Sequence, residues 1–172
     1  VVVGDRVRTG VTAILPHGGD IFRQKVPAAF ECFNGFGKAF GTVQIQELGV
    51  IETPILLGGT LCVPRIADAV LDHIIRNDRS GQIVSINPAV GETNDGFLSD
   101  GRARPIKSEH VSSAITGATD GPVAEGSVGA GAGTPYRTTH PAAVVAGSAT
   151  RAVTVPALST AARAVLGHRF AQ

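Results

Sequence analysis

The side chains best suited to bind a ligand or take part in a reaction lie between Asn87 and Asp100, where an apolar run ends in a turn rich in carboxylates. In this turn Glu92 follows a glycine and is flanked by small polar residues. A carboxylate that faces a cleft binds a cationic group strongly, because the local dielectric constant is low. A carboxylate in a loop also caps backbone amides or forms a structural salt bridge. The residues alone leave both roles open for Glu92.

A second candidate is the glycine-rich stretch Gly126–Gly133, because stacked backbone amides in such a turn can bind phosphate. The stretch lacks the Lys followed by Ser or Thr that phosphate loops carry, and no clear buried strand precedes it. We therefore expect a tight turn that brings two layers of the protein together.

The histidines show no metal-binding pattern. His17, His73 and His110 lack a second ligand three or four residues away, and the other two lie near the C-terminus. We expect no metal and no other cofactor, and we expect His17 to lie in a surface turn. Cys32 and Cys62 are far apart and have no such ligands nearby, which favours buried free thiols over a disulfide.

The bulk composition is that of an ordinary globular protein. The 172 residues are 43% hydrophobic and 17% charged, and the formal net charge is +1. This balance, with no Trp, gives no case for binding nucleic acid or an anionic membrane. No apolar run approaches the roughly twenty residues of a membrane-spanning helix, and the opening residues do not show a charged segment followed by an apolar run. We expect a cytoplasmic protein.

The pattern of apolar residues predicts strands followed by helices, and hence an α/β or α+β protein. Helical spacing of apolar residues after a proline predicts a first helix. A second helix is predicted with Ser108 as its cap. The predicted strands are Val11–Leu15, Lys25–Asn34, Gly41–Leu48, Ile51–Leu57 and Gln82–Ile86, and the predicted helices are Pro64–Asn77 and Lys107–Gly117.

The composition changes sharply after Gly133. From Thr134 to the end there is no Asp, Glu or Lys, and the only charged residues are four arginines. We therefore divide the chain into a region 1–133 and a divergent tail 134–172. Three interpretations of the tail stay open: a basic arm, a short Ala-rich helix over Thr160–Leu166, or a disordered segment translated from a shifted reading frame.

Several strings of residues, in one order along the chain, resemble a known family. They are Arg8–Ile14, Asn34–Lys38, Gln46–Ile55, Asn87–Asp100 and Gly121–Gly129. Together they are similar to the L-aminopeptidase/D-esterase (DmpA) family, which includes the β-peptidyl aminopeptidases and whose members are N-terminal-nucleophile peptidases. The resemblance covers about residues 6 to 133.

The resemblance implies an αββα sandwich of the DmpA/ornithine-acetyltransferase type, incomplete in this chain. It also implies a precursor that cleaves itself into α and β chains, with the new N-terminal serine as nucleophile and its own amine as base. The substrates would be short peptides, amides or esters with a free amino end. The glutamate at position 92 would hold the substrate amine, and Asn94 would line the same pocket.

The chain departs from the family pattern in two informative places. Where relatives carry Thr-Asn-Thr-Leu, this chain has Gly58-Gly59-Thr60-Leu61, which removes a side chain near the core or the site. After Gly133 we find neither the strand with the oxyanion asparagine nor the junction that leads into the nucleophilic serine. Gly147-Ser148 is the remaining candidate junction, and we assign no catalytic residue.

The sequence therefore predicts a truncated, inactive α-chain portion of an aminopeptidase that associates with a missing β chain or with further copies of itself. The alternative, from a different class, is a non-catalytic binding or assembly protein. Such a protein would keep the α-chain scaffold and associate through exposed strand edges.

Overall fold

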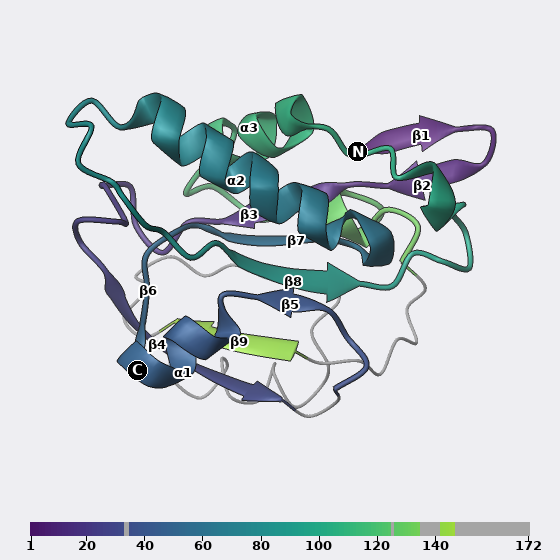
Figure 1. The fold of residues 1–172 in the computed structure, drawn as a ribbon. Coiled ribbons are helices and arrows are strands. Elements are labelled where there is room, and N and C mark those ends of the chain that lie inside the picture. The colour runs from purple at the N-terminus through teal and green to yellow at the C-terminus, as the bar shows by residue number, and fades with distance from the viewer. Residues whose placement is uncertain (33–34, 125, 135–141, 147–172) are drawn as a thin grey trace.

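Two stacked β-sheets lie on one side of a pair of helices (Figure 1). The computed structural model describes residues 1–32, 35–124, 126–134 and 142–146. The larger sheet has the order β3-β7-β8-β5, in which β7 and β8 are parallel and the outer strands antiparallel. The smaller sheet has the order β6-β4-β9, and β1 and β2 form a separate antiparallel pair. The strands are β1 (Val2–Gly4), β2 (Val7–Thr9), β3 (Val11–Ile14), β4 (Val26–Cys32), β5 (Ala39–Phe40), β6 (Val50–Ile51), β7 (Ile55–Gly59), β8 (Ala89–Thr93) and β9 (Ala142–Ala146).

Helices α2 (Val63–Asn77) and α3 (Ser108–Thr116) cover the outer face of the larger sheet (Figure 1). Pro64 lies in the first turn of α2, where its missing N–H would have no helical partner. Ile66 and Val70, one helical turn apart, are fully buried against the sheet. Both predicted helices are confirmed.

The central strands of the larger sheet are buried on both faces. Leu56 of β7 belongs to the core beneath the helices, whereas its neighbour Ile55 belongs to the core between the two sheets. Val90 and Ala89 of β8 divide in the same way, because successive side chains of a strand point to opposite faces. This layering of helices and sheets confirms the predicted α/β class.

The prediction of a strand over Gly41–Leu48 is wrong, because these residues form the helix α1 (Thr42–Leu48). Gly41 and Gly49 bound the helix in left-handed conformations that glycine adopts without steric cost. Only Ile45 of the helix is buried, whereas Val43 is 78% exposed. The alternation of apolar and polar residues therefore did not mark one buried face of a strand.

The predicted strand Gln82–Ile86 has no ladder partner among the residues that the structure describes, and the strand begins instead at Ala89. The predicted strand Ile51–Leu57 divides into β6 and β7, because Glu52 and Thr53 turn their polar groups toward the start of β8. At α3, the first helical residue is Ser108, and the backbone N–H of the cap residue donates to the His110 imidazole. The predicted Ser108 cap is therefore wrong.

The tail contributes a strand to the smaller sheet, since β9 pairs antiparallel with β4. The division of the chain at residue 133 stays a prediction. The predicted helix Thr160–Leu166 and the pair Gly147-Ser148 lie outside the described residues. Both cysteines are free thiols as predicted, but only Cys62 is buried, and Cys32 is exposed at the end of β4.

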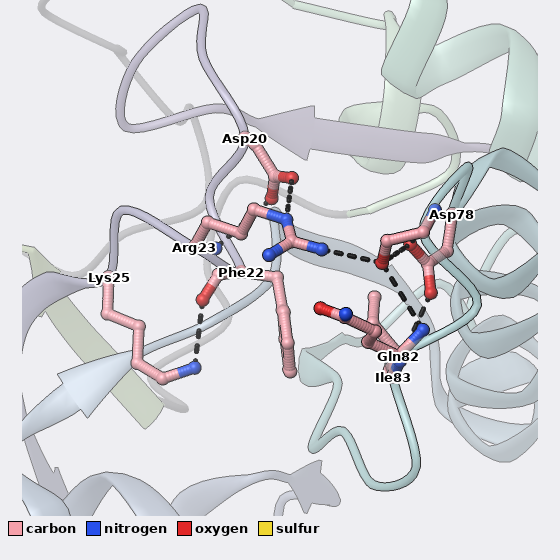
Figure 2. Close-up of polar contacts among 8 residues, drawn as sticks. Asp20, Phe22, Arg23, Lys25, Asp78, Gln82 and Ile83 are labelled. Carbon is pink, nitrogen blue, oxygen red and sulfur yellow. Dashed lines mark hydrogen bonds and ion pairs between the residues drawn. The ribbon is translucent and has the colours of Figure 1, made fainter.

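Polar contacts join the loop after β3 to the turn after α2 (Figure 2). Arg23 pairs with Asp20 at 3.4 Å and donates to the Ser80 hydroxyl at 2.5 Å. The Asp78 carboxylate accepts from the Ser80 backbone and from the backbone N–H of Ile83, which shapes the turn. These contacts organise the loop after β3 and the turn after α2, from which the chain continues to β8.

Candidate functional site

Glu92 lies within strand β8, one residue before its end, and not in a loop as the sequence suggested. Its side chain is 10% exposed. The Thr60 hydroxyl donates to Oε1 at 2.8 Å, and the Lys38 backbone N–H donates to Oε2 at 2.7 Å. The Lys38 ammonium lies 3.3 Å from the same Oε2. The carboxylate is therefore held by two neutral donors and one cation.

Strand register explains why these three residues meet. Gly58 of β7 pairs with Glu92 in parallel, so Thr60 follows directly where β7 ends. On the other side of β8, Ala39 pairs with Gly91 in antiparallel register, which places Lys38 beside Glu92. The carboxylate thus lies at the carboxyl end of parallel strands, a usual location for ligand sites in open α/β sheets.

An open cleft of about 710 Å³ lies over this end of the sheet. Glu92 and Asn94 both line it. Their assignment as substrate-binding residues stays a prediction. The Asn94 amide oxygen accepts from the Gly96 backbone N–H at 3.0 Å and so shapes the turn that forms one wall. Large apolar side chains at the cleft are exposed: Phe36 is 75% and Phe97 84% exposed.

Asp95 is a buried carboxylate beneath the cleft and was not singled out from the sequence. It is 4% exposed, and its oxygens lie against Gly59, where an added Cβ would be 2.8 Å from Oδ1. Burial raises the pKa of Asp95; a hydrogen bond with the Thr9 side chain opposes this, and the charge of Glu92 adds to it. The glycine at position 59 is thus the place where a missing side chain makes room for a buried acid.

The raised pKa of Asp95 predicts a pH-dependent effect of Asp95→Asn. The folded protein holds this proton more tightly than the unfolded chain, so the stabilising contribution is complete below the unfolded pKa of about 4 and is lost as the pH rises. The variant keeps an acceptor for Thr9 and cannot ionise. We expect it to be more stable than wild type at pH 7, by on the order of 1 kcal/mol, in urea unfolding. A variant that is less stable at pH 7, or equally improved at pH 4, would contradict this.

The glycine-rich stretch forms the tight turn predicted from its composition. Residues Gly129–Gly131 make a single 3-10 turn, and the Ala130 backbone N–H donates to the Thr12 hydroxyl of β3 at 2.9 Å. The Thr93 hydroxyl at the end of β8 donates to the Ala130 carbonyl at 3.3 Å. The turn therefore buttresses the strand that carries Glu92.

We find no cluster of three or more His, Cys, Asp or Glu side chains able to hold a metal among the described residues. His17 hydrogen-bonds within its own surface turn, to the Gln24 carbonyl and the Gly19 backbone N–H, as predicted. The chemistry that the site offers is that of a desolvated carboxylate beside a cleft, already paired with an ammonium group.

The structure is similar to aminopeptidases of known structure. A β-aminopeptidase from Burkholderia sp. is 37% identical, with a TM-score of 0.70, over 76% of this chain and 37% of that protein. The L-aminopeptidase D-Ala-esterase/amidase from Ochrobactrum anthropi, described as a new variant of the Ntn hydrolase fold, is 27% identical with a TM-score of 0.58 over 73% of this chain and 41% of that protein. The fold is thus that of Ntn-hydrolase aminopeptidases, over part of their length.

Sequence comparison specifies the family. The profile of Peptidase family S58 matches residues 1–166, and the chain belongs to this family. The β-peptidyl aminopeptidase BapA of Sphingosinicella microcystinivorans is 41% identical over 127 residues, which are 74% of this chain and 31% of BapA. The chain spans about a third of the length of that relative. The predicted family is confirmed, and the family profile extends the match beyond the predicted limit at residue 133.

Three residues of the site were not assigned from the sequence: Lys38, Thr60 and Asp95. Lys38 and Asp95 stand inside strings that carried the family resemblance, and Thr60 follows the two glycines that depart from it. Asp95 follows Glu92 closely in the sequence, whereas the proximity of Lys38 and Thr60 to Glu92 depends on strand pairing between distant segments. No local pattern in the sequence marks this proximity.

Within the described residues, the structure has no helix long and apolar enough to cross a membrane.

Proposed function

We propose that this chain supplies the amine-binding wall of an aminopeptidase cleft, in which the Glu92 carboxylate binds the free amino group of a short peptide, amide or ester. One observation carries the proposal: the carboxylate already holds an ammonium group at 3.3 Å beside an open cleft. A charge-assisted hydrogen bond of this kind contributes about 1.5 to 3 kcal/mol. Membership of family S58 agrees with this use.

In this proposal Thr60 and the Lys38 backbone N–H orient the carboxylate, and Asn94 shapes the adjoining wall. Each carboxylate oxygen accepts one neutral hydrogen bond, so the carboxylate cannot rotate freely. The nucleophile is a serine released by self-cleavage, as the family resemblance implies, and an oxyanion hole stabilises the tetrahedral intermediate. We assign neither group to a described residue.

The decisive experiment compares Glu92→Gln with wild type in binding aminoacyl amides. Leucinamide is tested as its L, D and β-homo forms, each beside its N-acetylated derivative, by NMR titration. The variant keeps an acceptor for the Thr60 hydroxyl but loses the charge, so we expect the ammonium forms to bind at least about tenfold more weakly. The N-acetylated forms should be unaffected.

The matched control is Glu109→Gln, which removes an exposed carboxylate that pairs with the neighbouring Lys107 at 3.8 Å. It should leave every titration unchanged. Equal binding of an ammonium ligand to wild type and to Glu92→Gln would refute the assigned role of Glu92.

An assembly role is the second candidate, supported by exposed apolar side chains on β5, the edge strand of the larger sheet, and on helix α1. Phe40 of β5 and Val43 and Leu48 of α1 are exposed, by 42%, 78% and 62%. Burying such side chains would stabilise association with a further copy or with a β chain. Light scattering tests this candidate, and a single monomeric species over the accessible concentration range would argue against self-association.

A further inference from the structure

The cation that pairs with Glu92 in this structure belongs to the protein itself. We infer that Lys38 is a specificity-determining residue: its ammonium occupies the amine site as an internal ligand, and the amino group of an incoming ligand must displace it. This inference rests on the proposed function of Glu92. It adds that the Lys38 ammonium competes with the ligand for Glu92, which the proposed function does not require.

The hydrogen-bond lengths show which partner of Glu92 can leave. The two neutral donors lie at 2.7 and 2.8 Å, and one is a backbone N–H whose position is set by the pairing of β5 with β8. The Lys38 ammonium lies farther away, at 3.3 Å, and ends a flexible side chain. An incoming ammonium group therefore replaces the Lys38 side chain while the neutral donors keep the carboxylate oriented.

Burial makes the exchange asymmetric. The Lys38 side chain is 40% exposed, whereas that of Glu92 is 10% exposed. The lysine can therefore return to water at small cost, but the carboxylate without a cation would be a desolvated negative charge beside the buried acid Asp95. Glu92 thus favours continuous occupation by some cation, and Lys38 fills that role when the cleft is empty.

An alternative position for the displaced ammonium lies close by. The Lys38 Nζ is already 5.3 Å from the centroid of the Phe36 ring, which also lines the cleft. A cation over an exposed aromatic ring is attracted weakly by the negative face of the ring. Lys38 can therefore leave Glu92 without leaving the cleft. Its positive charge there disfavours ligands that carry another positive charge besides their amino group.

The test measures binding of 3-methylbutylamine, an achiral ammonium with an apolar tail, to wild type, Lys38→Met and Lys38→Arg. The alcohol of the same skeleton serves as the neutral probe. Lys38→Met removes the competing charge and keeps the backbone N–H, so we expect the amine to bind about three- to tenfold more tightly and the alcohol to bind unchanged. Lys38→Arg keeps the competitor and should bind the amine about as wild type does.

A direct readout follows the lysine itself. In wild type, the side-chain NMR signal of Lys38 should shift as the amine is added, and it should stay in place when the alcohol is added. Lys38→Gln provides a second neutral variant in case methionine disturbs folding. A purely structural role for Lys38 would predict weaker amine binding in both neutral variants, which would overturn the inference.

Failure of the inference can be separated from failure of the proposed function by including Glu92→Gln. If Glu92→Gln binds the amine as well as wild type, the proposed function fails, and the inference fails with it. If Glu92→Gln loses the amine but neither neutral Lys38 variant gains affinity, only the inference fails. Unchanged Lys38 signals in amine-saturated wild type would also overturn it.

Discussion

Gly133→Ala is expected to destabilise the fold by about 3 kcal/mol in chemical denaturation. Gly133 has a φ of 76°, a conformation that costs a residue with a side chain of order 1 kcal/mol or more. In addition, a Cβ at this position would overlap the backbone carbonyl oxygen of Arg8, which cannot move without displacing β2. The two effects add, because one concerns the backbone conformation and the other the packing.

Gly126→Ala is the matched control for this prediction. Gly126 belongs to the same turn and has a φ of 84°, but a Cβ there would meet no atom within 4 Å. We expect this variant to lose only the conformational part, about 1 kcal/mol. Equal losses in the two variants would show that the close approach to Arg8 contributes nothing.

The elements that the sequence predicted correctly are those in which local pattern and packing agree. In α2 a proline marks the first turn, and apolar residues at helical spacing coincide with the buried face, including Ile66 and Val70. In β4 the apolar residues begin at Val26, which is buried between the sheets. Each of these signals lies within one short segment and needs no distant partner.

The segment Thr42–Leu48 shows how a local pattern can mislead. Alternating apolar residues fit a strand, but only Ile45 is taken into the core, so the alternation carries little of the folding free energy. The glycines that flank the segment decide its structure, since both adopt left-handed conformations at the helix ends. Glycine conformation depends on the surrounding chain and cannot be read from residue type.

The candidate site was predicted only in part for a similar reason. Glu92 and Asn94 lie in a string that carries the family resemblance, whereas Lys38 and Thr60 are 54 and 32 residues away from Glu92. Pairing of β5 and β7 with β8 brings them to the same carboxylate. Register of this kind is set by the whole sheet.

Glu52→Ala is expected to cost about 2 to 4 kcal/mol at pH 7, because Glu52 fixes the start of the strand that carries Glu92. The carboxylate is 7% exposed, and its Oε1 accepts from the Asn87 backbone N–H at 2.7 Å and from the Asn87 side chain at 3.1 Å. Its Oε2 pairs with the Lys25 ammonium at 3.0 Å. Lys25 is itself held by the Phe22 carbonyl (Figure 2). Urea unfolding measures the loss.

The pH dependence of stability separates the contribution of the Glu52 charge from that of its side-chain packing. Burial tends to raise the pKa of Glu52, but hydrogen bonds from the Asn87 backbone, Lys25 and the Asn87 side chain lower it below its ordinary value. A lowered pKa stabilises the fold above the unfolded pKa of about 4.3, and this contribution is lost as the pH falls through the folded pKa. The difference between wild type and Glu52→Ala should therefore shrink in acid.

Two further variants test whether the Glu52 carboxylate fixes the start of β8. Glu52→Gln keeps an acceptor for Asn87 and loses the pair with Lys25, so its loss at pH 7 should be smaller than that of Glu52→Ala. Asp72→Asn removes the partner of Arg76 in an exposed pair on α2 and should change stability by no more than about 0.5 kcal/mol. A Glu52→Ala loss as small as that of Asp72→Asn would mean that β8 finds its position without Glu52. A loss that stayed constant between pH 7 and pH 3 would mean that cavity formation, and not the charge, accounts for it.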